Sequence, residues 1–470
     1  DEEIVESPSA VGLLNATKIS GRTKNGLGIG FLNAVTEKTN VVIRDTITKN
    51  NRIETIEPLA NYNILVLDQR FNGNSSVSLI NTNVTRNGEF RDSNVSAAVF
   101  NLNTKKNTYN ANGAFRYSYV NSYENLDNKK GISTNLNLAE TAGKIRYSIG
   151  GQYVSDKYDN NDLGVNFQTN YFSLSSNVNY RILNSTDKLN SFRINLNAFV
   201  QYDNSTHYLQ EQNFNVNLNF TNKKNHSAGI GFNVNPFERY NFYNPKVKGR
   251  YVVFPKNYGT WMWISSNYNN KLAFDIEPNI GIAEANGWWY WGLMVKPRYR
   301  FSDRFSLIYT SNFYNEYQDL GRVDQVGDDI VFAKRDNKTI ENSLEGKFSI
   351  SSKMNFGLNV RQYWSFSENN SYHKLLENGY VEDYAYADNA NENYSSWNYD
   401  LTYSWWFAPG SQMTVLYRNN AEFESDIIDK KFNKNLKSVF NNEQLNHTFS
   451  ISIRYFIDYN QAKNVFKSKV

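Results

Sequence analysis

The strongest constraint on the fold is an alternation of apolar and polar side chains over residues 445–458. One parity carries Leu445, Phe449, Ile451, Ile453, Tyr455 and Ile457, and the other carries Asn446, Thr448, Ser450, Ser452, Arg454 and Asp458. A strand turns successive side chains to opposite faces, so this segment has one apolar face and one polar, charged face. Soluble sandwiches rarely repeat this pattern along long strands, one after another, as this chain does. The alternation therefore predicts an antiparallel β-barrel in a membrane.

The composition agrees with a barrel and excludes several other classes. The chain has 470 residues, with 50 Lys and Arg against 46 Asp and Glu, and this near balance argues against a nucleic-acid partner. The mean hydropathy is −0.64, and no apolar run reaches the roughly 18 residues that a transmembrane helix needs. Barrel strands average to neutral hydropathy because half of each strand faces water. The absence of Cys excludes disulfides and thiolate metal sites.

Strand candidates recur along the chain, each long enough to cross the hydrocarbon of a bilayer when tilted. The predicted strands are 10–22, 25–36, 60–70, 74–86, 92–103, 108–122, 131–141, 143–156, 167–183, 189–203, 207–221, 226–237, 258–268, 271–284, 287–302, 304–316, 338–351, 354–368, 394–408, 411–423 and 445–458. Short turns rich in Asn and Gly separate them on one side. The longest connections of the other side are 37–59, 238–257, 317–337, 369–393 and 424–444. Short periplasmic turns and long outer loops are typical of outer-membrane barrels.

The parity of the strand number predicts one further strand. If 445–458 ends in the periplasm, 10–22 begins on the outer side, whereas bacterial single-chain barrels have even strand numbers. We therefore expect a barrel of about 22 strands, about 21 of them in this chain and one before Asp1. A missed or invented strand is the alternative, and 329–333 is the segment most suited to it. The expected organisation is an outer-side lead-in segment at 1–9, the barrel at 10–458 and a periplasmic C-terminal tail at 459–470.

Arginines on the polar parity are the main chemical feature of the predicted strands. They are Arg116, Arg146, Arg181, Arg193, Arg361 and Arg454. Facing lipid, each would cost several kcal/mol, so we expect them to face the lumen. One hypothesis is that they line a passage for anions or sugars, because Arg and Asn present arrays of hydrogen-bond donors. The alternative is that they pair with carboxylates and hold the interior of the barrel together.

Tryptophans cluster toward the ends of the predicted strands. Those assigned to aromatic girdles at the membrane interfaces are Trp261, Trp263, Trp289, Trp291, Trp364, Trp405 and Trp406. Some loop aromatics could instead stack on carbohydrate, and Trp288 and Trp397 are the candidates for that role.

Metal binding and catalysis have weak support in the sequence. Asp156, Asp159 and Asp162 are spaced by three residues before Gly164, as in oxygen-rich loops that hold Ca²⁺, but EF-hand spacing and the terminal Glu are absent. An Asx-rich turn is therefore the favoured interpretation. The four His residues show no metal-ligand spacing, and no nucleophile elbow is present. We expect neither an enzyme nor a bound cofactor.

Three stretches resemble a known family. They are Asn15 to Thr36, which contains Lys18-Ile-Ser-Gly-Arg22, Arg70 to Arg86, and Trp397 to Ser411 with its Ala-Pro-Gly-Ser turn. Together they resemble Bacteroidota outer-membrane barrels of unknown function that follow a domain like carbohydrate-binding module family 9. The resemblance implies an outer-membrane location and a role connected with glycans. It implies no catalytic residues, and that domain and the first strand are absent from this sequence.

Two functions remain open at this point. The first is passage or capture of a polar, glycan-related solute, with the arginine-bearing face as the selective surface. The second is a structural subunit of a larger envelope complex for protein assembly, secretion or uptake. Barrels of this size are usually plugged, and long inward loops, the missing N-terminal domain or other envelope proteins are the expected plugs. The bilayer and its lipopolysaccharide are the remaining expected partners, without nucleic acid.

Overall fold

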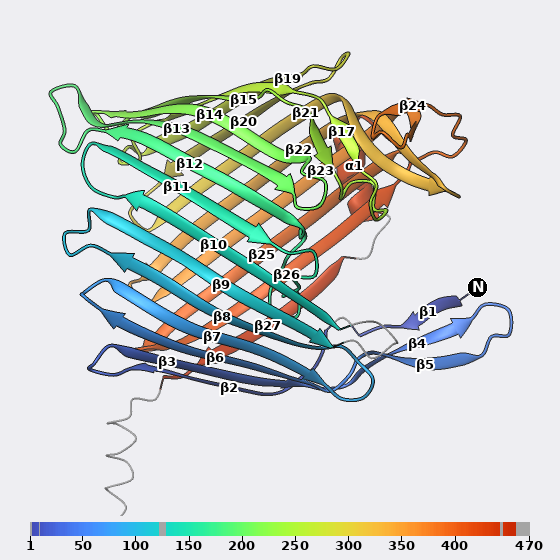
Figure 1. Cartoon of the computed structure of the whole chain (residues 1–470), viewed down its shortest axis with the longest axis horizontal. Coiled ribbons are helices and arrows are strands. Elements are labelled where there is room, and N and C mark those ends of the chain that lie inside the picture. The colour runs from blue at the N-terminus through green and yellow to red at the C-terminus, as the bar shows by residue number, and fades with distance from the viewer. Residues whose placement is uncertain (1, 9, 122–127, 442–444, 457–470) are drawn as a thin grey trace, which may run out of the picture. The chain divides into compact units, whose positions relative to one another are not determined.

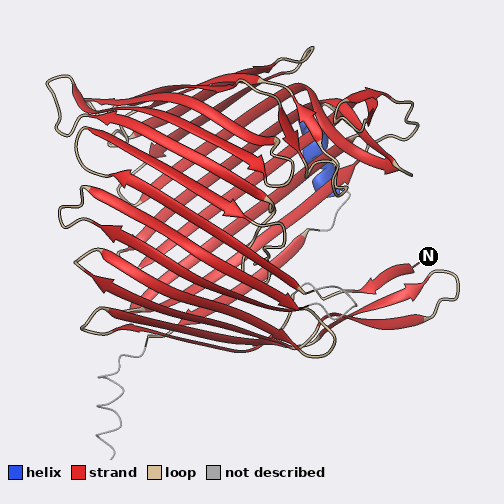
Figure 2. Ribbon diagram, in the orientation of Figure 1, coloured by secondary structure: helices blue, strands red, loops and turns tan. Residues whose placement is uncertain are grey.

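Strands make up almost all of the regular structure. The computed structural model describes residues 2–8, 10–121, 128–441 and 445–456. Strands account for 69% of the chain, and its main element is a large antiparallel sheet (Figure 2). Helix α1 (Phe432–Asn441) is the only helix in the part of the chain that is described. The prediction of an all-β antiparallel fold is therefore confirmed.

Two compact units divide the chain. The first comprises residues 1–181 and 195–214, and the second comprises 182–194 and 215–470. The strands that lie within the first unit are β1 (Glu2–Glu6), β2 (Leu13–Arg22), β3 (Leu27–Thr36), β4 (Thr39–Asp45), β5 (Asn51–Glu57), β6 (Ala60–Phe71), β7 (Ser75–Arg86), β8 (Asp92–Asn103), β9 (Tyr109–Asn121), β10 (Lys129–Glu140), β11 (Ile145–Val154) and β12 (Tyr171–Arg181). Strands β13 (Leu189–Asp203) and β14 (Leu209–Asn222) contain residues of both units.

The second unit contains the remaining strands. They are β15 (Ser227–Asn235), β16 (Arg239–Asn241), β17 (Val252–Phe254), β18 (Asn257–Ser265), β19 (Leu272–Ala283), β20 (Trp289–Arg300), β21 (Phe305–Val326), β22 (Asp329–Ser351), β23 (Met354–Leu375), β24 (Val381–Asp383), β25 (Glu392–Ala408), β26 (Ser411–Ser425) and β27 (Asn446–Arg454). Every strand predicted from the sequence overlaps one of the strands of the large sheet, from β2 at 10–22 to β27 at 445–458.

Within each unit, sheet strands that follow one another along the chain pair antiparallel (Figure 1). In the first unit the order runs from β2 through β3 and β6 to β12. In the second unit it runs from β15 through β18 to β23, then β25, β26 and β27. The turn between β6 and β7 shows how sequence sets this order, because Asn72 and Gly73 have φ values of 49° and 83°. Positive φ at both central residues gives the turn whose twist matches a hairpin.

The sheet is not closed into a barrel in the described part of the chain. Strand β2 pairs with β3, strand β27 pairs with β26, and each residue of β2 and β27 is exposed. Closure, which the sequence predicted, is therefore not observed. The predicted tail at 459–470 lies outside the described residues.

Several predicted loops have regular structure. The predicted lead-in segment contains β1, which pairs with β4, and the predicted loop 37–59 forms β4 and β5 of the same small sheet (Figure 1). The predicted loop 317–337 is wrong, because β21 and β22 continue and pair up to Val326 and Asp329. Segment 329–333 thus begins β22 and is not a separate strand. Ile330 and Phe332 in this part of β22 are buried against Val252.

Helix α1 occupies the predicted loop 424–444 and packs on strands of its own unit. The rings of Phe432 and Trp364 lie 6.2 Å apart between centroids. Asn393 joins the helix to the sheet, since its Oδ1 accepts from Trp364 Nε1 at 2.9 Å and its Nδ2 donates to Asn435 Oδ1 at 2.9 Å. The three side chains are almost completely buried. Alternation of apolar and polar residues did not predict this helix, because the apolar residues of a helix recur with a period of 3.6.

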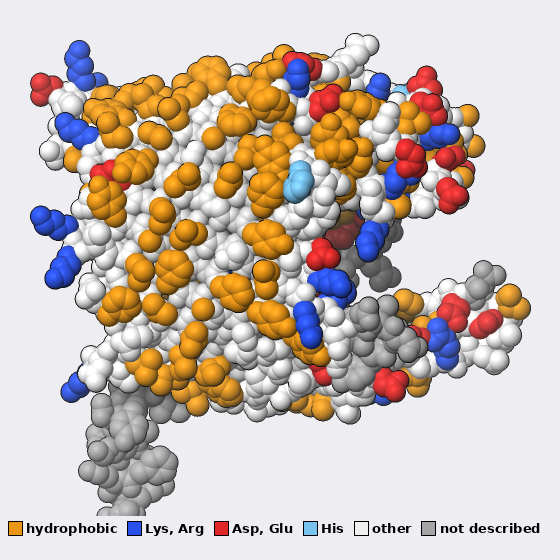
Figure 3. Space-filling model, viewed as in Figure 1, with side chains coloured by type: hydrophobic (Ala, Val, Ile, Leu, Met, Phe, Trp, Pro, Cys, Tyr) orange, Lys and Arg blue, Asp and Glu red, His pale blue; other side chains and the backbone are white. Residues whose placement is uncertain are grey.

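On strands β11 and β12 the apolar face is more exposed than the polar face, which is the opposite of the arrangement in a soluble protein. In β11 the side chains of Ile145, Tyr147 and Ile149 are 60%, 48% and 61% exposed. In β12, by contrast, Ser173 and Asn179 on the polar parity are 7% and 6% exposed. Figure 3 shows hydrophobic side chains spread over the strands on this face, with charged side chains mainly toward the strand ends. In β11 and β12 the apolar parity is thus the exposed one, and the polar parity is the more covered one.

Candidate functional site

The segment between β11 and β12, residues 155–170, folds back over the polar face of β9 and β10. The backbone of Tyr158 lies so close to Gly131 that a Cβ on this glycine would stand 2.2 Å from the Tyr158 Cα. Ser118 Oγ accepts a hydrogen bond from the Asp159 amide at 3.0 Å, and Ser155 Oγ accepts one from the Ile132 amide at 2.9 Å. The segment, which we call the inward loop, is therefore seated on the strands by backbone contacts.

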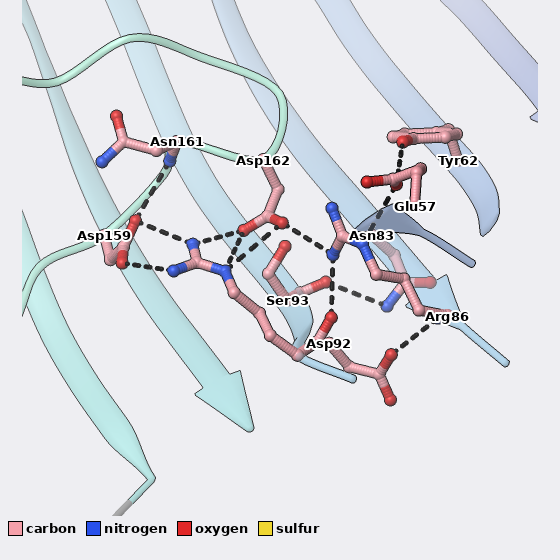
Figure 4. Close-up of polar contacts among 10 residues, drawn as sticks. Glu57, Tyr62, Asn83, Arg86, Asp92, Ser93, Asp159, Asn161 and Asp162 are labelled. Carbon is pink, nitrogen blue, oxygen red and sulfur yellow. Dashed lines mark hydrogen bonds and ion pairs between the residues drawn. The ribbon is translucent and has the colours of Figure 1, made fainter. Parts of the chain in front are cut away.

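Two arginines hold the carboxylates of the inward loop (Figure 4). Arg91 Nη2 lies 2.6 Å from Asp162 Oδ2, and its two terminal nitrogens donate to the two oxygens of Asp159 at 3.1 Å each. Arg86 Nη1 lies 2.8 Å from Asp162 Oδ1, and Arg86 Nε lies 3.4 Å from Glu57 Oε1. The Asp162 side chain is 5% exposed. Charge-assisted, forked contacts of this kind are among the strongest hydrogen bonds in proteins.

The ion pairs lower the pKa of both carboxylates. Burial raises the pKa of Asp159, but the hydrogen bonds and charge of Arg91, together with a hydrogen bond from the Asn161 amide, leave the pKa below its usual value. Burial likewise raises the pKa of Asp162, and the hydrogen bonds from Arg91 and Arg86 again lower it overall. The same contacts raise the pKa of Arg91 against the opposing effect of burial. Asp159, Asp162, Arg86 and Arg91 are therefore ionised at neutral pH.

Two cavities flank the inward loop. One, of about 400 Å³, is lined by charged residues of the network, among them Glu57, Arg86 and Asp162. The other, of about 340 Å³, lies between the loop and the polar face, and Arg116 is the only charged residue among those described that line it. The loop thus separates a site with charges of both signs from a site with a single cation.

The six predicted arginines lie on six different strands. Three lie in the first unit, where Arg116 donates to Asn135 Oδ1 at 2.9 Å, Arg146 to the Gly143 carbonyl at 3.3 Å, and Arg181 to Asn179 Oδ1 at 2.7 Å. The other three are Arg193, Arg361 and Arg454 in the second unit. Of these, Arg361 pairs with Glu341, as the alternative of carboxylate pairing predicts, and Arg454 is exposed on the edge strand β27. Only Arg116 lines one of the cavities beside the inward loop.

The Ca²⁺ hypothesis receives no support from the geometry. The carboxylates of Asp159 and Asp162 are bonded to guanidinium groups, and Asp156 is exposed. Among the described residues, no group of three or more His, Cys, Asp or Glu side chains has an arrangement that could hold a metal.

The predicted tryptophan girdle is wrong in three positions. Trp364 is 1% exposed under α1, so it cannot face a membrane interface. Trp261 and Trp263 lie on the polar parity, where they cover Gly231 and Gly229. Trp289 and Trp406 are 36% and 41% exposed, and Trp291 and Trp405 are partly exposed, so these four remain candidates.

The two tryptophans considered for carbohydrate stacking have protein partners. Trp288 Nε1 donates to Glu316 Oε1 at 2.8 Å, and the Trp397 ring lies 5.3 Å from that of Phe440. Their rings therefore contribute to packing within the second unit.

Sequence reasoning missed Arg86 and Arg91, which anchor the inward loop. Their partners lie 68 to 76 residues further along the chain. The available signal was the Asp-rich loop itself, since three aspartates on one short segment require cationic partners when that segment is buried.

No helix in the described residues is both long enough and apolar enough to cross a membrane. The chain matches the family described as Domain of unknown function (DUF5916) over residues 1–466. It therefore belongs to this family, and the predicted membership of a family of unknown function is confirmed. A comparison with curated proteins finds no match.

Proposed function

We propose that this chain forms the wall of a β-barrel in a bacterial outer membrane and passes or captures a polar, glycan-related solute. The observation that carries the proposal is the inverted exposure of the strands, whose apolar parity is outward. In water, an apolar surface of this extent would drive aggregation, whereas in lipid it is the favoured surface. The lineage implied by the three sequence motifs, Bacteroidota, belongs to the same proposal.

The chemistry of the polar parity supports a polar solute. Asn177 Nδ2 donates to Asn197 Oδ1 at 2.6 Å, and Asn179 Nδ2 donates to Asn177 Oδ1 at 2.8 Å. Carboxamides carry donors and acceptors together, so they can exchange such contacts for the hydroxyls of a sugar. The inward loop supports a narrowed passage, because it covers part of this face.

Paired substitutions on neighbouring residues of β11 test the membrane proposal. Ile149→Arg places a charge on the exposed apolar parity, and Ser148→Arg places the same charge on the polar parity. We expect Ile149→Arg to lower the yield of folded, heat-modifiable protein in bilayers, because Arg facing lipid near the bilayer centre costs about 2–4 kcal/mol. The matched Ser148→Arg variant should insert normally. Equal insertion of both variants would contradict a lipid-facing apolar surface.

Single-channel conductance in a planar bilayer tests whether the chain passes a polar, glycan-related solute. We expect steady single-channel conductance in high salt that falls when neutral oligosaccharide is added. Channels that are indifferent to sugars would argue against a glycan-related solute. Electrical silence of correctly inserted protein would argue against a passage and favour the second function.

The second function is a non-enzymatic subunit of a larger envelope complex. It is favoured by the small sheet of β1, β4 and β5, whose outer strands each pair on one side only in the described residues. Exposed apolar side chains there include Ile4 and Ile53, at 66% and 72%. Open strand edges of this kind accept strands of other proteins. Stable co-purification with envelope proteins after mild detergent extraction would support this function, and an isolated monomer would count against it.

A further inference from the structure

The cavity between the inward loop and the polar face is lined by one positively charged side chain and by no negatively charged one among the described residues. It has a volume of about 340 Å³, and its lining includes Arg116, Asn135, Gln152, Tyr158, Asn160 and Tyr171. These residues come from β9, β10, β11, the loop and the start of β12. The cavity therefore combines one cation, several carboxamides and two phenol rings.

The inward loop keeps its own carboxylates out of this cavity. Asp159 and Asp162 are bound by Arg91 and Arg86 on the other side of the loop. Neither aspartate lines the cavity, although both flank Asn160, which does. As a result, Arg116 meets no neutralising carboxylate in the described part of the chain.

Two groups in the cavity have capacity left for a ligand. Arg116 donates through Nη1 to Asn135 Oδ1 at 2.9 Å, which leaves most of its guanidinium donors without a described protein acceptor. Asn160 Oδ1 is buried and has no hydrogen-bond partner. A buried amide oxygen without a donor costs about 1–3 kcal/mol, so a hydroxyl group that donated to it would be bound favourably.

We propose that this cavity binds an acidic sugar, with Arg116 on the carboxylate and the carboxamides on the hydroxyl groups. A planar guanidinium fork matches a carboxylate in geometry as well as charge. Asn135, Gln152 and Asn160 supply donors and acceptors for hydroxyls, and Tyr158 and Tyr171 offer apolar ring surface beside polar tips. This assignment rests on the proposed passage or capture of a glycan-related solute and names its chemical class.

The test compares two ligands with the same sugar rings and hydroxyl groups, one anionic and one neutral. A trimer of galacturonic acid carries carboxylates, and its fully methyl-esterified form is neutral with the same rings and hydroxyls. Titration calorimetry of the whole folded chain in a detergent without a sugar headgroup measures both. We expect the acid to bind about tenfold more tightly than the ester, the difference that one charge-assisted contact gives. Equal affinity for acid and ester would overturn the assignment.

Three variants test whether the preference for the acid over the ester arises in this cavity. Arg116→Gln should reduce the affinity for the acid to that for the ester. Gln152→Glu adds a carboxylate to the same cavity without changing the shape of the side chain. It should weaken binding of the acid and leave the affinity for the ester within about twofold of the unmodified chain. Arg70→Gln removes a largely exposed arginine of β6 that does not line the cavity, and it should change neither affinity. An acid preference that survives both cavity variants would overturn the assignment, even if one variant folds poorly.

The outcomes also distinguish failure of the acidic-sugar site from failure of the proposed passage on which it rests. A sugar-sensitive channel that binds acid and ester equally would leave the passage standing and overturn the acidic-sugar site. A chain that neither conducts nor binds either trimer would overturn both.

Discussion

Arg91 and Asp162 are 71 residues apart in the chain, yet Arg91 Nη2 and Nε lie 2.6 and 3.1 Å from the same oxygen of Asp162. This contact fixes where the inward loop lies on the polar face. It also determines which residues line the cavity around Arg116, because the loop's aspartates face their own arginines. The charge of that cavity is thus set by residues that do not line it.

Removing Arg91 should release the inward loop. In Arg91→Gln the buried Asp162 keeps Arg86 and its hydrogen bond with Ser93, and Asp159 loses both of its forked contacts. Breaking a fully buried pair costs about 3–5 kcal/mol, but Arg91 is 38% exposed, so we expect a loss of about 1–2 kcal/mol. Limited trypsin digestion measures it, because the exposed Lys157 lies in the loop. Cleavage after Lys157 should become faster.

The control for this prediction is Arg52→Gln. Arg52 also pairs with carboxylates, but in the small sheet of β1, β4 and β5. Cleavage after Lys157 should keep its original rate in this variant. An unchanged rate in Arg91→Gln would show that backbone contacts alone seat the loop.

Acid should release the loop as well. The folded pKa values of Asp159 and Asp162 lie below the usual value of about 3.9. Their contribution to stability is therefore fully present above that value and is lost as pH falls through the lowered folded pKa. Hydrogen exchange of the Asp159 amide, corrected for its intrinsic pH dependence, should show protection that is constant near neutral pH and falls below about pH 4.

The double variant Asp159→Asn with Asp162→Asn serves as the control for the acid effect. Its amides cannot change charge, so protection in the loop should be lower at neutral pH and should not fall further in acid. Retention of the acid-dependent step in the double variant would assign the effect to other carboxylates.

The sequence predicted the strands because alternation is a local property. Ile145, Tyr147 and Ile149 fall on one parity by counting, and the structure exposes the same three residues. Strand ends were harder, since β21 and β22 continue into 317–337, which was predicted to be a loop. Their continuation depends on Val252, a distant residue that covers Ile330 and Phe332.

The candidate site could be predicted only in part. Arg116 was identified from parity, and its position on the polar face needs only the register of β9 and β10. The role of Arg91 depends on how the inward loop folds back, which no local pattern encodes. Trp364 failed as a girdle residue for the same reason, because α1, from a distant segment, covers it.

Gly131 should be required for the position of the inward loop. In Gly131→Ala the new Cβ would stand 2.2 Å from backbone atoms of Tyr158, so the loop must move. Overpacking of this kind typically costs about 1–3 kcal/mol, and we expect faster cleavage after Lys157 with unchanged heat-modifiability. Gly21→Ala in β2 is the matched control, because no atom lies within 4 Å of its added Cβ. A Gly131→Ala variant as protected as the control would contradict the close seating of Tyr158.

Asn393 should hold helix α1 to the sheet. In Asn393→Leu the buried Nε1 of Trp364 and the side chain of Asn435 each lose a partner, and an unpaired buried polar group costs about 1–3 kcal/mol. We expect hydrogen exchange in residues 432–441 to accelerate by about tenfold or more while the strands of the second unit keep their protection. Substituting the exposed Lys437 with Ala should leave exchange in the helix unchanged. If Asn393→Leu behaves like the Lys437 variant, the apolar contact between Phe432 and Trp364 is sufficient to hold the helix.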